Sequence, residues 1–104
     1  MRLTVYWTRF AEHKLDDIYE YFLYKAGPKV AESIVSELIE RTLYLEDHPN
    51  MGPKEDLLKH RPQDFRYLIQ GNYKIIYRIN HEQKRIEIFN VFDTRQDPGK
   101  LDRT

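Results

Sequence analysis

The residues best suited to act on an anionic partner are four cations in the second half of the chain, Arg66, Lys74, Arg78 and Arg95. Arginine can hold a phosphate through paired hydrogen bonds and can stabilise charge that builds on its oxygens. Cleavage of RNA without a metal ion is therefore chemically possible for such a set. It also requires groups that accept and donate a proton, and no histidine falls in the place expected for such a group.

Other catalytic patterns are sparse in this sequence. The histidines are far apart along the chain, and we expect each of them to be exposed: His13, His48, His60 and His81. Neither a Gly-x-Ser-x-Gly nor a His-Glu-x-x-His pattern occurs, and the four glycines form no phosphate-binding run. We therefore predict no metal site and no cofactor.

Length and composition favour one domain over residues 1–104. The chain has no cysteine, which fits a reducing cytoplasm, and we find neither a signal peptide nor a membrane-spanning run. Its net charge is zero, but residues 1–53 carry −3 and residues 54–104 carry +3. This asymmetry favours a basic face in the second half, although ordinary surface solvation explains the counts equally well.

Hydrophobic periodicity in the first half predicts one strand and two helices. Alternating apolar and polar residues over 2–7 predict a short strand. Thr8 can cap a helix that runs to about Tyr24, and Gly27-Pro28 can end it and start a second helix that stops near Asp47. The apolar stripes are Ala11, Leu15, Ile18, Phe22 and Ala26 in the first helix and Ala31, Ile34, Val35, Leu38, Thr42 and Leu45 in the second.

The second half predicts three strands, in runs of β-branched and aromatic residues from Phe65 to Ile69, Tyr73 to Ile79 and Arg85 to Phe92. Gly71-Asn72 is a good two-residue turn, so these strands should form an antiparallel meander. Residues 54–63 have no clear period and indicate a long, mobile loop, and the segment from 93 to 101 is polar and turn-rich. The order β-α-α-β-β-β predicts an α+β two-layer sandwich, with the helical hairpin packed on one face of a small antiparallel sheet.

The two-residue turn also sorts the hairpin residues into two faces. We expect the helix-facing side to carry Arg66, Leu68, Gln70, Tyr73, Ile75, Tyr77 and Ile79. The opposite side, for which no helix is left, should carry Phe65, Tyr67, Ile69, Lys74, Ile76 and Arg78. Cations among aromatic side chains suit contact with bases and phosphates, but they also suit the solvated side of an ordinary strand.

Three local patterns, in this order, resemble the RelE/ParE superfamily of bacterial type II toxins, the plasmid stabilisation type. They are 7–11 (WTRFA) leading into 15–21 (LDDIYEY), Leu45 through Pro49 to Gly52, and 71–79 (GNYKIIYRI). The resemblance extends to the closing 91–95 (VFDTR). It implies a cytoplasmic toxin that an antitoxin neutralises, with a toxin–antitoxin hetero-oligomer as a possible assembly.

The resemblance leaves two targets open, because some members cut messenger RNA on the ribosome and others poison DNA gyrase. For the ribonuclease activity it implies Lys74 and Arg95 as catalytic residues. This chain departs from that branch, because Phe65 and Tyr67 stand where the ribonucleases are basic. The histidine or tyrosine expected near the C-terminus is also missing, since no tyrosine follows Tyr77.

The long helical hairpin resembles the ParE-like branch more closely, which favours gyrase as the target and a non-catalytic inhibitor as the mechanism. The ribosome-dependent ribonuclease, and a non-toxic module that only binds an antitoxin, remain as alternatives. The contact candidates for gyrase are Arg66, Arg78 and Arg95. The full set of target-binding candidates is Arg66, Tyr67, Lys74, Arg78 and Arg95.

Overall fold

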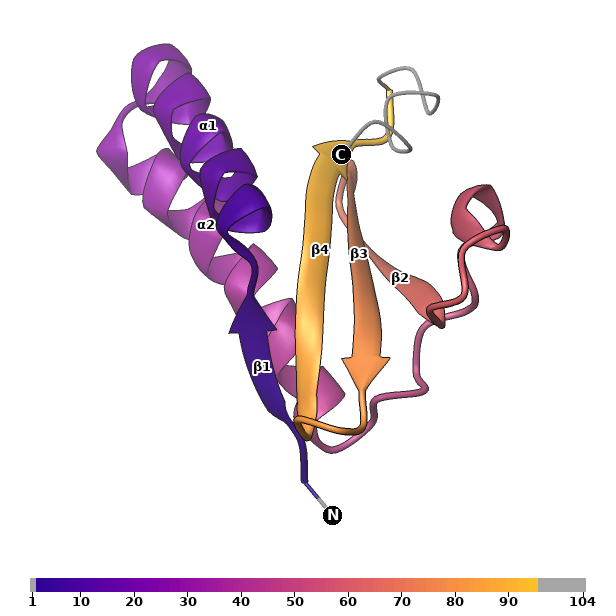
Figure 1. The fold of residues 1–104 in the computed structure, drawn as a ribbon. Helices are drawn as coiled ribbons and strands as arrows, with labels where there is room; N and C mark the ends of the chain where they lie inside the picture. The colour runs from indigo at the N-terminus through magenta and orange to yellow at the C-terminus, as the bar shows by residue number, and fades with distance from the viewer. Residues whose placement is uncertain (1, 96–104) are drawn as a thin grey trace.

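Two helices and a four-stranded sheet make up the computed structural model, which describes residues 2–95 (Figure 1). The elements follow the predicted order: β1 (Thr4–Trp7), α1 (Arg9–Ala26), α2 (Pro28–Leu43), η1 (Tyr44–Glu46), η2 (Asp56–Leu58), β2 (Phe65–Gln70), β3 (Tyr73–Asn80) and β4 (Arg85–Asp93). The predicted turn-rich segment after Phe92 continues beyond residue 95, and that part lies outside the described residues. None of the described helices is long and apolar enough to span a membrane.

The helical hairpin begins and turns where the sequence predicts. The Thr8 hydroxyl accepts a hydrogen bond from the Ala11 amide over 3.2 Å and donates one to the Ile88 carbonyl over 2.8 Å, so the cap of α1 also ties the helix to β4. Gly27 joins the helices with φ at +92°, a value that favours glycine. The second helix ends at Leu43, and the rest of the predicted helix continues as the 3₁₀ turn η1.

The sheet has the strand order β1-β4-β3-β2. The meander of β2, β3 and β4 is antiparallel as predicted, and Gln70 faces Tyr73 across the two-residue turn. The sheet as a whole is mixed rather than antiparallel, because β1 lies parallel to β4. No hairpin joins β1 to its neighbour, and the intervening helices allow it to enter the sheet in the same direction as β4.

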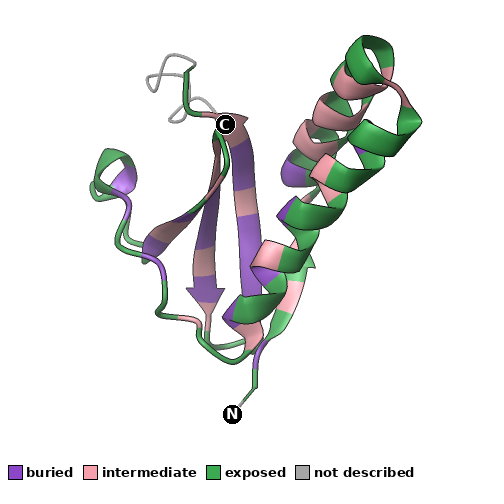
Figure 2. Cartoon of the chain, turned by 180° about the vertical axis from the view of Figure 1, so that it is seen from behind, coloured by how far each residue is buried: buried purple, intermediate pink, exposed green. Residues whose placement is uncertain are grey.

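The helix-facing side of the sheet holds the larger core, formed with both helices by Leu3, Ala11, Leu38, Leu45, Leu68, Ile75, Tyr77, Ile79, Ile86, Ile88 and Val91. Figure 2 shows buried positions on the strands and exposed positions along the outer sides of the helices. The predicted helix-facing set is confirmed at Leu68, Ile75, Tyr77 and Ile79.

A smaller core lies on the opposite side of the sheet, where the sequence predicts no cover. Leu58 of η2 packs there with Phe65 and Ile76, flanked by Tyr67, Phe89 and Phe92. The connection before β2 therefore covers part of this side. It also adds a short bridge to the edge of the sheet, between Lys54 and Arg66.

Candidate functional site

Lys74 lies under the connection that precedes β2. Its Nζ is 2.5 Å from Oε1 of Glu55, whose side chain is only 2% exposed, and 4.2 Å from the centre of the Tyr67 ring. Lys74 and Tyr67 are therefore in contact, and the buried carboxylate of Glu55 also contacts Lys74. The positive charge of Lys74 is therefore compensated within the fold.

Local backbone bonds position Glu55. Its amide donates to the Phe65 carbonyl over 2.8 Å, and its Oε2 accepts a hydrogen bond from the Leu57 amide over 2.9 Å, which caps η2. The other oxygen, Oε1, is left to face Lys74. Sequence reasoning missed Glu55, because its only local signal is the position of a carboxylate two residues before Leu57 in a stretch without periodicity.

Arg66 contacts the segment that follows α2. Its Nη1 donates to the Gly52 carbonyl over 2.9 Å, and its Nε is 3.3 Å from Asp64. The neighbouring Tyr77 hydroxyl donates to the Pro49 carbonyl over 2.8 Å and accepts a hydrogen bond from the Gly52 amide over 3.0 Å. Burial raises the pKa of Tyr77, and the Gly52 hydrogen bond opposes this shift. Most of the Arg66 side chain is thereby engaged within the fold.

Arg78 shares one carboxylate with a second arginine. Its Nε donates to Glu87 Oε1 over 2.6 Å, while Arg85 Nε and Asn80 Nδ2 donate to Oε2 over 2.7 and 3.1 Å. Burial of the Glu87 carboxyl raises its pKa, but the hydrogen bonds from Arg78, Arg85 and Asn80 more than offset this, so the pKa is lowered. Sequence reasoning found Arg78 but not Arg85 or Glu87, which alternate along β4.

Arg95 lies beyond the end of β4 and folds back on Asp93. Its Nε and Nη2 donate to the two carboxylate oxygens over 2.9 and 2.5 Å. The two residues border a hollow of about 390 Å³ between α1 and the end of the sheet, lined also by Lys14, Asp17, Ile18, Tyr21, Phe22, Tyr73, Val91 and Phe92. With 72% of its side chain exposed, Arg95 is the most accessible of the predicted cations.

The five predicted target-binding residues thus lie in different parts of the structure and do not form one site. Lys74 and Tyr67 meet, and Arg78 lies on the same side of the sheet by strand alternation. Arg66 lies on the other side, under the segment after α2, and Arg95 borders the hollow beside α1. The four histidines are exposed, as predicted. Within residues 2–95, no three His, Asp or Glu side chains are arranged to bind a metal ion.

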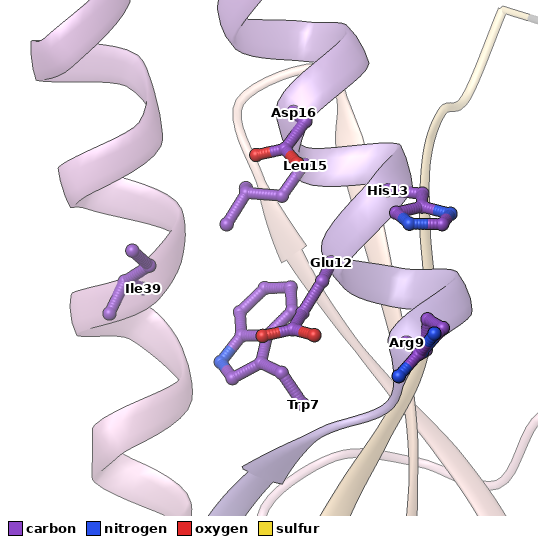
Figure 3. Close-up of a pocket in the computed structure, with 7 residues that line it drawn as sticks. All are labelled: Trp7, Arg9, Glu12, His13, Leu15, Asp16 and Ile39. Carbon is purple, nitrogen blue, oxygen red and sulfur yellow. The ribbon is translucent and has the colours of Figure 1, made fainter.

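A second hollow, of about 520 Å³, lies between α2 and the beginning of α1. Figure 3 shows Trp7 and Leu15 at the gap between the helices, with Ile39 facing them from α2, while His13 lies on the far side of α1. Glu12 and Asp16 place carboxylates beside these apolar groups. An apolar floor with a charged rim is typical of a contact with another protein.

Comparison with known proteins identifies the family. No curated protein matches the chain by sequence. Among solved structures, the chain resembles one from the chromosomal ParDE toxin–antitoxin system of P. aeruginosa, with a TM-score of 0.72, 24% identity and coverage of 88% of this chain and 96% of that one. It also resembles one from the RelBE2 toxin–antitoxin complex of Mycobacterium tuberculosis, with a TM-score of 0.56, 20% identity and coverage of 89% and 99%.

These two likenesses concern the fold, whereas the family model is matched by sequence over most of the chain. That model is described as the ParE toxin of the type II toxin–antitoxin system parDE, and it matches residues 5–98. The match includes both helices and all but the first residue of the sheet. The chain therefore belongs to the ParE toxin family of type II toxin–antitoxin systems.

Proposed function

We propose that this toxin arrests growth by binding DNA gyrase and trapping an enzyme–DNA intermediate, without breaking a bond itself. A cognate antitoxin would cover the toxin until it is needed. The hollow between the helices, where charged side chains surround Trp7 and Ile39, is a surface that suits an antitoxin segment. Arg66, Arg78 and Arg95 are the proposed contacts to the target.

The observation that carries the non-catalytic mechanism is the contact between Lys74 and Glu55. If the chain were a ribonuclease, the resemblance would make Lys74 a catalytic residue, which must be free to meet the RNA. Here Lys74 Nζ faces a buried carboxylate 2.5 Å away and its side chain is only 19% exposed, so a phosphate would have to compete with Glu55 for the same cation. A negative charge so close to the reaction centre would also repel the phosphate.

A supercoiling assay tests the proposal. Purified toxin is added to bacterial gyrase, relaxed plasmid and ATP, and the DNA is examined after the gyrase is denatured. We expect supercoiling to fall and linear DNA to accumulate, since a trapped intermediate releases broken DNA. Normal supercoiling in the presence of excess toxin, together with cleavage of messenger RNA on ribosomes, would establish the ribonuclease mechanism instead. If neither target is affected, the chain is an antitoxin-binding module only.

Paired substitutions make the assay specific. The double variant Glu55→Gln/Lys74→Met removes both charges of the buried pair, so neither is left alone. On the gyrase mechanism this variant should inhibit supercoiling as the parent does, whereas a ribonuclease would lose its phosphate-binding lysine. Arg95→Ala should weaken toxicity on either mechanism, because Arg95 is exposed and is a contact candidate in both. Circular dichroism of each variant would confirm that it is folded.

A further inference from the structure

In the cluster of Arg78, Arg85 and Glu87, the two arginines have hydrogen-bond donors that Glu87 does not use. Each arginine reaches Glu87 through Nε alone, so each retains two Nη groups with four N–H donors. The Nη atoms take no part in these bonds to Glu87. The side chains of Arg78 and Arg85 are 31% and 30% exposed, so their remaining donors are accessible from solvent.

The cluster also carries a fixed excess of positive charge. Two guanidinium groups surround one carboxylate, and both oxygens of that carboxylate are occupied. The Glu87 carboxylate cancels only one of the two positive charges, so the cluster still attracts an incoming anion. The main effect of Glu87 is to hold both arginines at adjacent positions on β3 and β4, which lowers the ordering cost of binding. The adjacent turn, 81–84, adds Glu82 and Lys84, whose charges cancel.

An aromatic ring lies beside this charge. The Cζ atom of Arg85 lies 4.0 Å from the centre of the Tyr6 ring, and Tyr6 is 44% exposed. Tyr6 pairs with Glu87 across β1 and β4, and Arg78 pairs with Glu87 across β3, so the three form one row across the sheet. Guanidinium groups that hold phosphates beside an aromatic ring that stacks bases are typical of surfaces that bind single-stranded nucleic acid.

We propose that Arg78, Arg85 and Tyr6 form a binding site for a nucleic-acid strand, in which the two arginines hold phosphate groups and Glu87 positions them. An acidic protein segment could also meet the arginines, but it would make no use of the exposed ring of Tyr6. This inference adds a DNA contact to the proposed function and rests on it only for the identity of the strand, which would be DNA held by gyrase. Binding itself needs no gyrase.

Fluorescence anisotropy tests the site with the full-length toxin and short, labelled single-stranded oligonucleotides of DNA and of RNA. We expect binding that weakens as salt is raised. Arg85→Gln should lower the affinity by about tenfold or more and reduce the slope of log affinity against log salt by roughly one, because one phosphate contact is lost. Lys29→Gln, which makes the same charge change on the exposed side of α2, should leave both quantities near those of the parent.

A second variant guards against misfolding. In Arg85→Gln/Glu87→Gln no carboxylate is left with a missing partner, and the net charge equals that of the parent. It should melt near the parent temperature and still bind more weakly. In the parent, the Nε–H signals of Arg78 and Arg85 in ¹H–¹⁵N NMR spectra should shift when the oligonucleotide is added.

Three results would overturn the site. In the first, a folded Arg85→Gln variant binds the oligonucleotide as tightly as the parent. In the second, the Nε–H signals of Arg78 and Arg85 do not shift when the oligonucleotide is added. In the third, poly-glutamate shifts these signals as much as the oligonucleotide does. The last would identify an acidic protein as the partner. Stronger binding of RNA than of DNA would keep the site but assign it to an RNA strand. None of these results depends on the supercoiling assay, so the site and the proposed target can fail separately.

Discussion

The side chains that could contact a phosphate are distinguished in this molecule by their intramolecular partners. Lys74 faces a carboxylate with 2% exposure, whereas the carboxylate that Arg95 contacts is at the end of a strand and Arg95 itself is largely exposed. Moving a buried pair apart leaves a charge without compensation, so Lys74 is costly to recruit for a ligand. Because the Arg95 side chain is 72% exposed, a ligand can reach it from solvent, and Arg95 is therefore the better contact candidate.

The contact between Asp93 and Arg95 leads to a prediction about pH. Hydrogen bonds from the Arg95 side chain and backbone lower the pKa of Asp93 from 3.8 to about 2. Because the folded value is depressed, the stability that this contact gives is present above about pH 4 and is lost as the pH falls through 2. Carboxyl ¹³C NMR should give an Asp93 midpoint near 2. Arg95→Ala removes the side-chain hydrogen bonds but keeps that of the backbone amide, so it should raise the midpoint part of the way toward 3.8, while Arg2→Ala, at a distant exposed arginine, should not move it. A parent midpoint near 4 would show that the contact does not persist in solution.

At the scale of elements, a buried tyrosine helps to hold the connection from α2 to β2. The Tyr77 hydroxyl bonds both Pro49 and Gly52, and Gly52 packs so closely that an added Cβ would lie 2.2 Å from the Tyr67 carbonyl oxygen. Tyr77→Phe should therefore lower the free energy of unfolding by about 1–3 kcal/mol, since buried polar groups lose their partners. Urea denaturation measures this change.

The matched control is Tyr24→Phe, which removes the same hydroxyl from a side chain that is 87% exposed. Its free energy of unfolding should stay within about 0.5 kcal/mol of the parent value. Equal effects of the two substitutions would mean that the Tyr77 hydroxyl does not anchor the connection.

Elements whose contacts are local were predictable from sequence. Apolar spacing gave both helices, Thr8 gave the start of α1, and the Gly71-Asn72 turn gave the register that sorts β2 and β3 into two faces. The direction of β1 was not predictable, because no short turn links it to β4. The cover over the second face was missed as well, since Leu58 packs on residues that are remote in sequence and sits in a stretch without a period.

The candidate site was predictable only in part, for a related reason. Alternation placed Lys74, Tyr67 and Arg78 on one side of the sheet, which depends only on the turn. It could not supply their partners, because Glu55 comes from an irregular segment and Glu87 from another strand. A cation on a strand thus looks free in sequence whenever its carboxylate arrives through tertiary structure. The accessibility of the site, and hence the choice between catalysis and binding, depends on those partners.

At the scale of the whole molecule, two cores share one sheet, and this predicts that the chain unfolds as a single domain. The helical hairpin packs on the side of the sheet that carries Ile75 and Ile88, and the connection before β2 packs on the side that carries Ile76. If the strands separate, both layers lose the apolar surface on which they pack, so the two layers should unfold together.

Far-UV circular dichroism follows both helices, and the fluorescence of Trp7 reports on the contact of β1 with the larger core. The two signals should give the same urea midpoint. Tyr77→Phe, which acts on β3 and the connection before β2, should lower both midpoints together. Two separate transitions, with Trp7 unaffected by Tyr77→Phe, would show instead that the helical hairpin and the meander are independent units.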